Sequence, residues 1–522
     1  MSHISLGLFF AGTATAAAAS QPTVSVSVDA AGGAEPFPHN WQRSFGSGHA
    51  LLATRADWQA QLKRAVAEIG LRGVRMHGLL DDDMSVMLDA HTYSWYNVDK
   101  VFDFLVAEGV TPIVELSFMP SAIAANKEAY SFANRGGYKG LNSPPSDYNA
   151  WYDLIHALGT HLVARYGVGE VSRWSFEVWN EMWGMPYPTA YVPLYNASAR
   201  ALKAVHPSLI VGGPSSANLA DIPELIADAA ALGVPLDFVS SHHYPSDPSC
   251  SHAGPHAGKA ECFSLDVLAA AAVATNASKP FYLTEYKDGL QGGPGTGFGG
   301  RHGDTAYAAA FVVHTLPRLT SLDLVSWWTF SDIFEENWMI GKPFYGGFGL
   351  LTIDGVAKPA YRAFELLAGA GTRRLTAVTV DDAAPGYMNE STISAFATLG
   401  DARGVGDALQ IFVANFGPEE GASPAPWSPV PRNVSLSLAG VHAKGAMLRR
   451  IDDATTAPYD AWAKLGSPPY PTAAQVEAVA AASQMSEEWL PLEAAVEVEG
   501  PLARAVFEVP AYGVAHLTIA AA

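Results

Sequence analysis

The amino-acid sequence predicts an α/β protein, a (β/α)8 TIM barrel with an accessory β-sandwich domain. Eight short buried runs alternate with helical patterns between about residues 41 and 370, and this number of units over this length is typical of such a barrel. After residue 370 the helical periodicity fades and short strand-like runs follow, as in a small β-sandwich. A doubly wound open sheet is the alternative, and it is weakened because no GxGxxG motif follows a strand.

The barrel strands are expected where apolar and aromatic residues form short runs, because strands of a parallel sheet are buried on both faces. The eight runs cover residues 45–48, 73–77, 112–116, 175–181, 209–213, 238–242, 281–285 and 324–328. Helices are expected between them at residues 57–69, 97–109, 147–166 and 221–233, where helical spacing or capping residues mark the segment.

The sandwich is expected to contain strands at residues 409–414, 434–438, 505–509 and 514–517, interrupted by a helical stretch at about 473–485. Residues 23–28 alternate polar and apolar side chains, which predicts a half-buried strand on an antiparallel sheet. This strand does not match the barrel pattern, so we expect it to join the sandwich. The predicted domains are an N-terminal strand at 21–40, the catalytic barrel at 41–370 and the sandwich at 371–522.

The first 20 residues resemble a signal peptide, because an apolar and then alanine-rich segment at residues 6–19 ends in small residues. No lysine or arginine precedes this segment, which departs from the usual pattern. We therefore expect a secreted or periplasmic protein. No other stretch is long and apolar enough to span a membrane.

The overall charge limits the classes of partner. The formal net charge is −20 and only 16% of the 522 residues are charged. Nucleic acids and anionic membranes require a basic face, so neither is expected, whereas a neutral carbohydrate fits. A homo-oligomer is compatible with the sequence.

The two cysteines, Cys250 and Cys262, lie in one loop that also contains histidines. They predict either a single loop-closing disulfide in an oxidising compartment or two free thiols. The chain has no CxxC pattern, and the neighbouring His242 and His243 point to opposite faces of a strand. Neither a metal nor another cofactor is therefore expected.

Two carboxylates carry the functional prediction. Glu181 ends the fourth buried run after Asn180, and Glu285 ends the seventh. The carboxyl ends of barrel strands build the active site, and a carboxylate there is costly unless it is paired or used. A pair of such residues is typical of a retaining glycosidase. The alternative is that each is a salt-bridged structural residue.

The sequence resembles glycoside hydrolase family 39, which contains β-xylosidases and α-L-iduronidases. The resemblance lies in ordered motifs at residues 45–50, 74–83, 118–120, 176–181, 211–214, 237–244, 283–286, 328–336 and 346–350. The family also carries a β-sandwich beside its barrel, which agrees with the interpretation of residues 371–522.

The resemblance implies a role for each matching residue. Glu181 would be the general acid/base and Glu285 the nucleophile. Asn180 would bind the sugar 2-hydroxyl, Arg75 would hold the nucleophile ionised, and Tyr244 would donate a hydrogen bond to it.

Other matching residues would line the sugar site: His49, His242, Trp328, Glu335 and Glu336, with His77 in a supporting position. Trp328 would form an apolar floor under the sugar. Glu177 shares the strand face of Glu181, and we interpret it as a buried structural partner.

The resemblance is stronger to the β-xylosidase branch, so an exo-acting retaining β-xylosidase is the main hypothesis. The alternatives are an α-L-iduronidase-like or other β-glycosidase, and an inactive carbohydrate-binding relative. Ser241, where bacterial xylosidases tend to carry arginine, and the unusual loop at 246–262 leave the sugar open.

Overall fold

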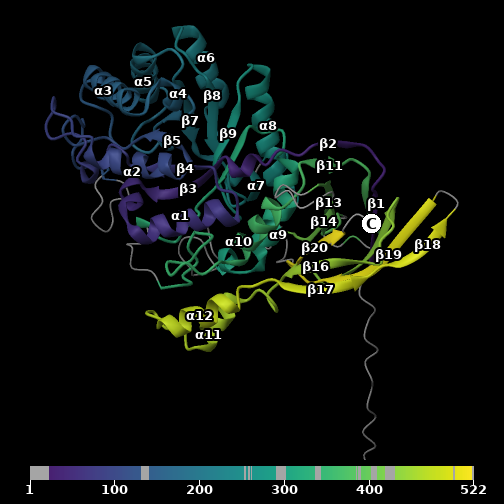
Figure 1. Ribbon diagram of the computed structural model, residues 1–522. Helices are drawn as coiled ribbons and strands as arrows, with labels where there is room; N and C mark the ends of the chain where they lie inside the picture. The colour runs from purple at the N-terminus through teal and green to yellow at the C-terminus, as the bar shows by residue number, and fades with distance from the viewer. Residues whose placement is uncertain are drawn as a thin grey trace, which may run out of the picture.

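The computed structural model describes residues 23–130, 140–251, 254–256, 259, 261–289, 301–335, 342–383, 385, 390–400, 408–417, 429–497 and 500–519. The chain forms a barrel surrounded by helices and a β-sandwich beside it (Figure 1). The predicted fold class is therefore confirmed. The predicted signal peptide at 1–20 lies outside the described residues.

Eight parallel strands form the closed barrel, in chain order, with the last strand pairing with the first. Each corresponds to one predicted run. The strands are β3 (Ser44–His49), β4 (Gly73–His77), β5 (Thr111–Leu116), β6 (Ser175–Val178), β7 (Ile210–Ser216), β8 (Phe238–His242), β9 (Phe281–Tyr286) and β10 (Leu324–Trp327). The run predicted at 175–181 is too long, because β6 ends at Val178 and the next three residues leave the strand.

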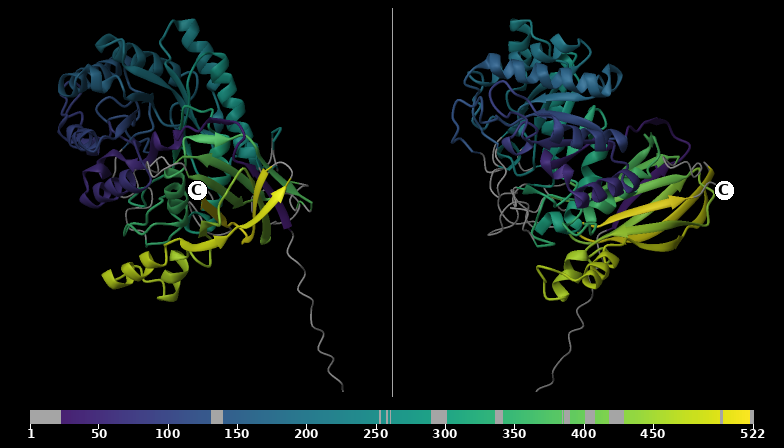
Figure 2. Two further views of the ribbon diagram at one scale, coloured as in Figure 1. Left: turned by 45° about the vertical axis from the view of Figure 1, so that its right-hand side comes forward. Right: turned by 60° about the vertical axis from the view of Figure 1, so that its left-hand side comes forward.

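Helices cover the outside of the barrel (Figures 1 and 2). The four predicted helices correspond to α1, α2, α3 and α6, with small shifts at their ends. Asp147 caps α3 by accepting a hydrogen bond from the Asn149 backbone N–H, and Gly167 at φ 81° ends it. The set is α1 (Ala56–Glu68), α2 (Tyr96–Ala107), α3 (Tyr148–Tyr166), α4 (Val168–Val171), α5 (Tyr191–Val205), α6 (Ile222–Leu232), α7 (Pro248–Ser251), α8 (Cys262–Asn276), α9 (Ala306–Thr315) and α10 (Pro359–Ala368).

The barrel interior changes from apolar to charged along the strands. Ile113, Phe238, Tyr282 and Leu324 form one buried cluster near the beginning of their strands, and the rings of Phe238 and Tyr282 stack 4.5 Å apart. Because side chains alternate along a strand, residues two positions further on share the same face. On β5 this next position is Glu115, which is 1% exposed. The polar layer therefore lies toward the carboxyl ends, where such barrels place their active sites.

The sandwich consists of two sheets with strand orders β12-β1-β15-β19-β18 and β17-β16-β20-β14-β13-β11-β2. The N-terminal strand β1 joins the first sheet, and Val24, Val26 and Val28 are buried in its core. The expectation of an antiparallel sheet is wrong for one edge of β1, which pairs antiparallel with β12 but parallel with β15. The whole barrel lies between β1 and β15 in the chain, and parallel pairing requires such a long connection.

The sandwich strands are distributed over both ends of the chain. They are β1 (Thr23–Asp29), β2 (Ala34–Pro36), β11 (Arg373–Leu375), β12 (Val378–Asp382), β13 (Ile393–Leu399), β14 (Leu409–Asn415), β15 (Arg432–Ala439), β16 (Gly445–Ile451), β17 (Ser486–Pro491), β18 (Glu493–Glu497), β19 (Gly500–Val509) and β20 (Val514–Ile519). The first two, from the N-terminal segment, lie among strands of the C-terminal part (Figure 1).

Two helices, α11 (Pro458–Lys464) and α12 (Ala473–Ala481), project from the sandwich between β16 and β17 (Figures 1 and 2). The sequence predicted only the second. Thr472 and Gln475 form a capping box that begins α12. Trp462 and Val479 of this pair pack against Phe344 in the loop after β10, so the insertion contacts the barrel.

The two alternatives for the cysteines are resolved in favour of a disulfide between Cys250 and Cys262. None of the helices in the described part of the chain has the length and apolar character needed to cross a membrane.

Candidate active site

Glu181 lies beyond the end of β6, the fourth barrel strand. Its backbone N–H donates a hydrogen bond to the carbonyl oxygen of Ser215 at 2.7 Å, and Trp179 and Glu181 adopt φ angles of 70° and 48°. Such conformations are uncommon outside glycine and concentrate at functional sites. They place the Glu181 carboxylate among buried groups, where the residue is 9% exposed.

Glu285 lies near the end of β9, the seventh barrel strand, and contacts a cation and a hydroxyl donor. Arg75 Nη1 donates to Oε1 at 2.7 Å, and Tyr244 Oη donates to Oε2 at 2.7 Å. His77 Nε2 lies 3.8 Å from Oε1. Both 2.7 Å contacts are short, and the one with the Arg75 guanidinium is charge-assisted.

His242, the last residue of β8, lies between the two carboxylates. Its Nδ1 is 3.1 Å from Glu181 Oε1 and 3.5 Å from Glu285 Oε2, while Nε2 lies 3.3 Å from Ser215 Oγ. One carboxylate oxygen of Glu181 and one of Glu285 lie within 4.8 Å of each other. The ends of the fourth and seventh barrel strands therefore face each other.

Burial affects Glu181 and His242 in opposite directions. Desolvation raises the pKa of Glu181 to about 7, and the nearby Asp247 adds to this effect. Desolvation lowers the pKa of His242 to about 4, although Glu285 opposes the shift. At neutral pH His242 is therefore uncharged, and Glu181 is partly protonated.

Arg75 on β4 connects the polar layer of the barrel. Its guanidinium lies 2.7 Å from Glu115 and 2.5 Å from Glu177, and donates to Asn180 Oδ1 at 2.9 Å. Glu177 also accepts a hydrogen bond from Thr284 Oγ1 at 2.8 Å and is fully buried, which fits the structural role predicted for it. Glu115 was not predicted for the site, although it too is a glutamate in a buried run.

His49 at the end of β3 lies in a second acidic group. Its Nε2 lies 2.7 Å from Asp81 and 3.3 Å from Asp83, and its backbone N–H donates to Glu335 Oε2 at 2.7 Å. Burial lowers the pKa of His49, but Asp81 and the other carboxylates offset this and raise the pKa well above its usual value. Asp81 was not predicted; its neighbours Asp82 and Asp83 in the motif were the available signal.

Trp328 forms an apolar wall next to these charged groups. Its ring centroid lies 4.7 Å from that of His77, and Phe334 contacts it edge to face at 5.8 Å. A Cβ at Gly46 would collide with this ring, so a glycine is required beneath it. Glu336, also predicted for the site, lies outside the described residues.

Two groups in this site have ligand atoms close enough for a metal ion: Glu181, His242 and Glu285, and His49, Asp81 and Asp83. Each is already paired internally. Arg75 neutralises Glu285 in the first group, and in the second His49 Nε2 makes a direct 2.7 Å contact with Asp81. We therefore assign no metal to either.

The site therefore contains two carboxylates at the ends of the fourth and seventh strands of a (β/α)8 barrel. One has a raised pKa and the other is paired with arginine. This arrangement is that of the glycoside hydrolases. The family comparison agrees. The model of glycosyl hydrolases family 39 matches residues 24–496, and the chain belongs to this family. It is an O-glycosyl hydrolase that acts on a carbohydrate.

The chain is similar in sequence and in structure to several β-xylosidases. The chain is 35% identical over 465 residues to a beta-xylosidase of Caldicellulosiruptor saccharolyticus, covering 86% of this chain and 89% of the relative. It is 33% identical over 373 residues to a beta-xylosidase of Geobacillus stearothermophilus, covering 66% and 71%. The crystal structure of a monomeric beta-xylosidase from Caulobacter crescentus CB15 matches with a TM-score of 0.76 and 27% identity, covering 95% of this chain and 99% of that one.

Proposed function

We propose that this protein is an exo-acting retaining β-xylosidase. The observation that carries the proposal is the pair Glu181 and Glu285, whose carboxylate oxygens approach within 4.8 Å. A separation of about 5–5.5 Å between the two carboxyl groups is characteristic of retaining enzymes, whereas inverting enzymes need about 6.5–9.5 Å to admit a water molecule. The β-xylosidase relatives support the choice of sugar.

In the first step Glu285 attacks the anomeric carbon and forms a glycosyl–enzyme ester. At the same time the bond to the leaving oxygen breaks, and Glu181 donates its proton to that oxygen. The raised pKa of Glu181, about 7, keeps a proton available for this step. Arg75 and Tyr244 fix the orientation of the attacking carboxylate through their 2.7 Å contacts.

In the second step Glu181, now ionised, accepts a proton from water, and the resulting hydroxide displaces Glu285 from the anomeric carbon. Both inversions occur at the same carbon, so the configuration is retained. His242 is 3.1 Å from Glu181 and uncharged at neutral pH, so it can donate a hydrogen bond to the carboxylate without adding a positive charge.

Asn180 is placed to bind the sugar 2-hydroxyl. Arg75 donates to its Oδ1 at 2.9 Å, which directs the amide N–H2 group toward the substrate. A hydrogen bond to the 2-hydroxyl strengthens as positive charge develops on the ring in the transition state. Its contribution is therefore expected in kcat as well as in KM.

The charges around His49 favour a neutral sugar over a uronic acid. Asp81, Asp83 and Glu335 surround this one cation, and Arg75 is already shared among carboxylates. An α-L-iduronide would bring a further carboxylate into this acidic site. The main alternative, an α-L-iduronidase-like activity, is therefore disfavoured.

Hydrolysis of p-nitrophenyl β-D-xylopyranoside by the wild type and by Glu285→Ala, with and without azide, tests the proposal. We expect turnover by the wild type, loss of turnover in the variant, and an α-xylosyl azide product when azide replaces the missing nucleophile. A variant with wild-type turnover would refute the assignment of Glu285. Turnover of the corresponding α-L-iduronide, with none of the xyloside, would refute the assignment of the sugar.

A further inference from the structure

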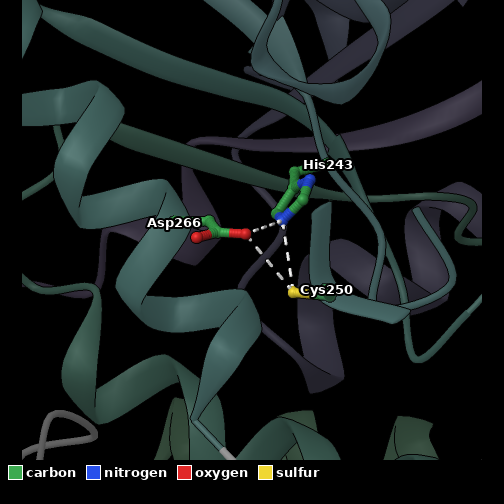
Figure 3. Close-up of side chains that lie close together, drawn as sticks. All are labelled: His243, Cys250 and Asp266. Atoms are coloured by element: carbon green, nitrogen blue, oxygen red, sulfur yellow. Dashed lines mark hydrogen bonds and ion pairs between the residues drawn. The ribbon is translucent and has the colours of Figure 1, made fainter. Parts of the chain in front are cut away.

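A second cluster of ligand-type side chains lies outside the active site, where the segment after β8 meets α8. His243, Cys250 and Asp266 converge there (Figure 3). His243 Nε2 lies 3.7 Å from Cys250 Sγ and 3.5 Å from Asp266 Oδ2, and Cys250 Sγ lies 3.5 Å from the same carboxylate oxygen. The mechanism above uses none of these three residues.

The disulfide partner Cys262 belongs to the same group. Cys262 Sγ lies 3.6 Å from Asp266 Oδ2. The two residues are four apart on α8, so they lie on one face of the helix. Cys250 and Cys262 are 7% and 4% exposed, and His243 is fully buried. A disulfide, an imidazole and a carboxylate thus meet in a site almost closed to solvent.

The separations between these atoms match the edges of a tetrahedral metal site. Zinc lies about 2.3 Å from sulfur and about 2.0–2.2 Å from nitrogen or oxygen. A tetrahedron with these bond lengths has ligand-to-ligand edges of roughly 3.3–3.8 Å. The four separations that involve His243 or Asp266, 3.5, 3.5, 3.6 and 3.7 Å, lie in this range. The two sulfurs are bonded to each other and must move apart to take up a cation.

Neighbouring side chains orient the ligands as outer partners do in metal sites. His243 Nδ1 lies 3.1 Å from Asp247 Oδ2, and a proton held there leaves the lone pair of Nε2 facing the cluster. Phe263 stacks on the imidazole at 5.3 Å. His256 Nδ1 lies 2.6 Å from Asp266 Oδ1, so that Oδ2 remains directed at the sulfurs.

We propose that His243, Cys250, Cys262 and Asp266 form a site for a thiophilic divalent cation of the zinc class, which is filled when the two cysteines are reduced. The disulfide and the cation are alternative occupants of the same position. A dithiol reductant supplies two electrons and two protons to the disulfide and leaves as its own cyclic disulfide. The cation then binds both sulfurs as thiolates and releases their two protons.

The site is connected to the catalytic residues through one short segment. His242 and Tyr244, on either side of His243, contact Glu181 and Glu285 respectively. The backbone N–H of Tyr244 donates to Asp247 Oδ2 at 2.9 Å, the oxygen that also holds His243. Filling the site would therefore anchor the segment that carries these two active-site side chains, and we expect it to raise the unfolding temperature of the reduced protein.

Cobalt(II) binding to the full-length protein tests the proposal. The chain is reduced with a dithiol, freed of reductant without air, and titrated with cobalt(II). We expect one ion per chain, with the intense near-ultraviolet band of a thiolate–cobalt bond and the visible bands of tetrahedral cobalt. The oxidised protein should give neither signal. The other two acidic groups contain no sulfur, so they cannot produce the charge-transfer band.

Variants separate the site from adventitious binding. Asp266→Asn retains both cysteines and the disulfide, and it should weaken cobalt binding and change the visible bands. The double variant Cys250→Ser/Cys262→Ser should lose the charge-transfer band. His256→Gln, which removes only an outer partner, should bind about 10–100-fold more weakly. Circular dichroism and thiol counts confirm that each variant is folded and reduced.

Two results would overturn the proposal. One is a reduced wild type whose cobalt spectrum equals that of the double serine variant. The other is an Asp266→Asn variant, folded and fully reduced, with the affinity and spectrum of the wild type.

Discussion

The raised pKa of Glu181 predicts a pH-dependent cost in stability that a single substitution can remove. Burial raises this pKa from 4.5 to about 7, and a shift of about 2.5 units corresponds to about 3 kcal/mol. The folded protein holds this proton more tightly than the unfolded chain. The stabilisation of the folded state by the proton bound to Glu181 is therefore fully present below pH 4.5 and is lost as the pH rises through about 7.

Glu181→Gln removes the titration while retaining the shape of the side chain and an acceptor for His242, which lies 3.1 Å from Oε1. The variant should match the wild type in stability near pH 4. At pH 8 it should be more stable by up to about 3 kcal/mol, because the wild type must then keep a buried carboxylate ionised. Burial of Glu181, the proposed general acid, thus lowers the stability of the fold at alkaline pH.

Thermal unfolding of both proteins from pH 4 to pH 8 measures this difference. At about 2 °C per kcal/mol for a large domain, the melting temperature of the variant should exceed that of the wild type by up to about 6 °C at pH 8. Glu285→Gln is the matched control, and it should be less stable than the wild type at pH 8 because Arg75 loses a partner at 2.7 Å. An equal shift for Glu181→Gln at pH 4 and pH 8 would refute the reasoning.

Three further substitutions test other contacts. Tyr244→Phe removes the donor to Glu285 and should lower kcat on aryl β-xylosides about 10-fold or more, since a hydrogen bond to a charged group contributes about 1.5–3 kcal/mol; an unchanged kcat would contradict this. Gly48→Ala places a Cβ against the Glu335 carboxylate and should raise KM while circular dichroism stays unchanged. Arg75→Lys keeps the charge but loses the planar fork shared by buried carboxylates, and denaturant unfolding should show a loss of about 2 kcal/mol or more.

The barrel was predictable because its strands are buried on both faces, so each one appears as a continuous apolar run. The end of β6, in contrast, could not be predicted from the sequence. The run continues through Trp179 to Glu181, but the backbone turns to positive φ at both residues. Bulky side chains rarely adopt that conformation, and nothing local in the sequence marks it. The contact from Ser215 on another strand accompanies the turn.

The site was predictable where residues that act together also follow one another in the chain, as Asn180 and Glu181 do. Asp81 was missed because its contact with His49 joins residues far apart in the sequence. The cluster around His243 was missed for the same reason. Adjacent histidines do face apart, as expected, but only the fold shows that α7 and α8 bring sulfur and carboxylate groups to the outward-facing one.

The proposed division of labour between Glu181 and Glu285 rests on their surroundings and does not depend on which strand each one ends. Glu285 contacts the Arg75 guanidinium and the Tyr244 hydroxyl at 2.7 Å each, and these contacts suit the anion that the proposed nucleophile must be. Glu181 contacts the uncharged His242 and is desolvated, so its pKa is raised to about 7. Two carboxylates with separated environments are the general basis for assigning an acid and a nucleophile. Exchanging their roles would require a cation in contact with Glu181, and His242, which lies 3.1 Å from it, loses its proton at a pH of about 4.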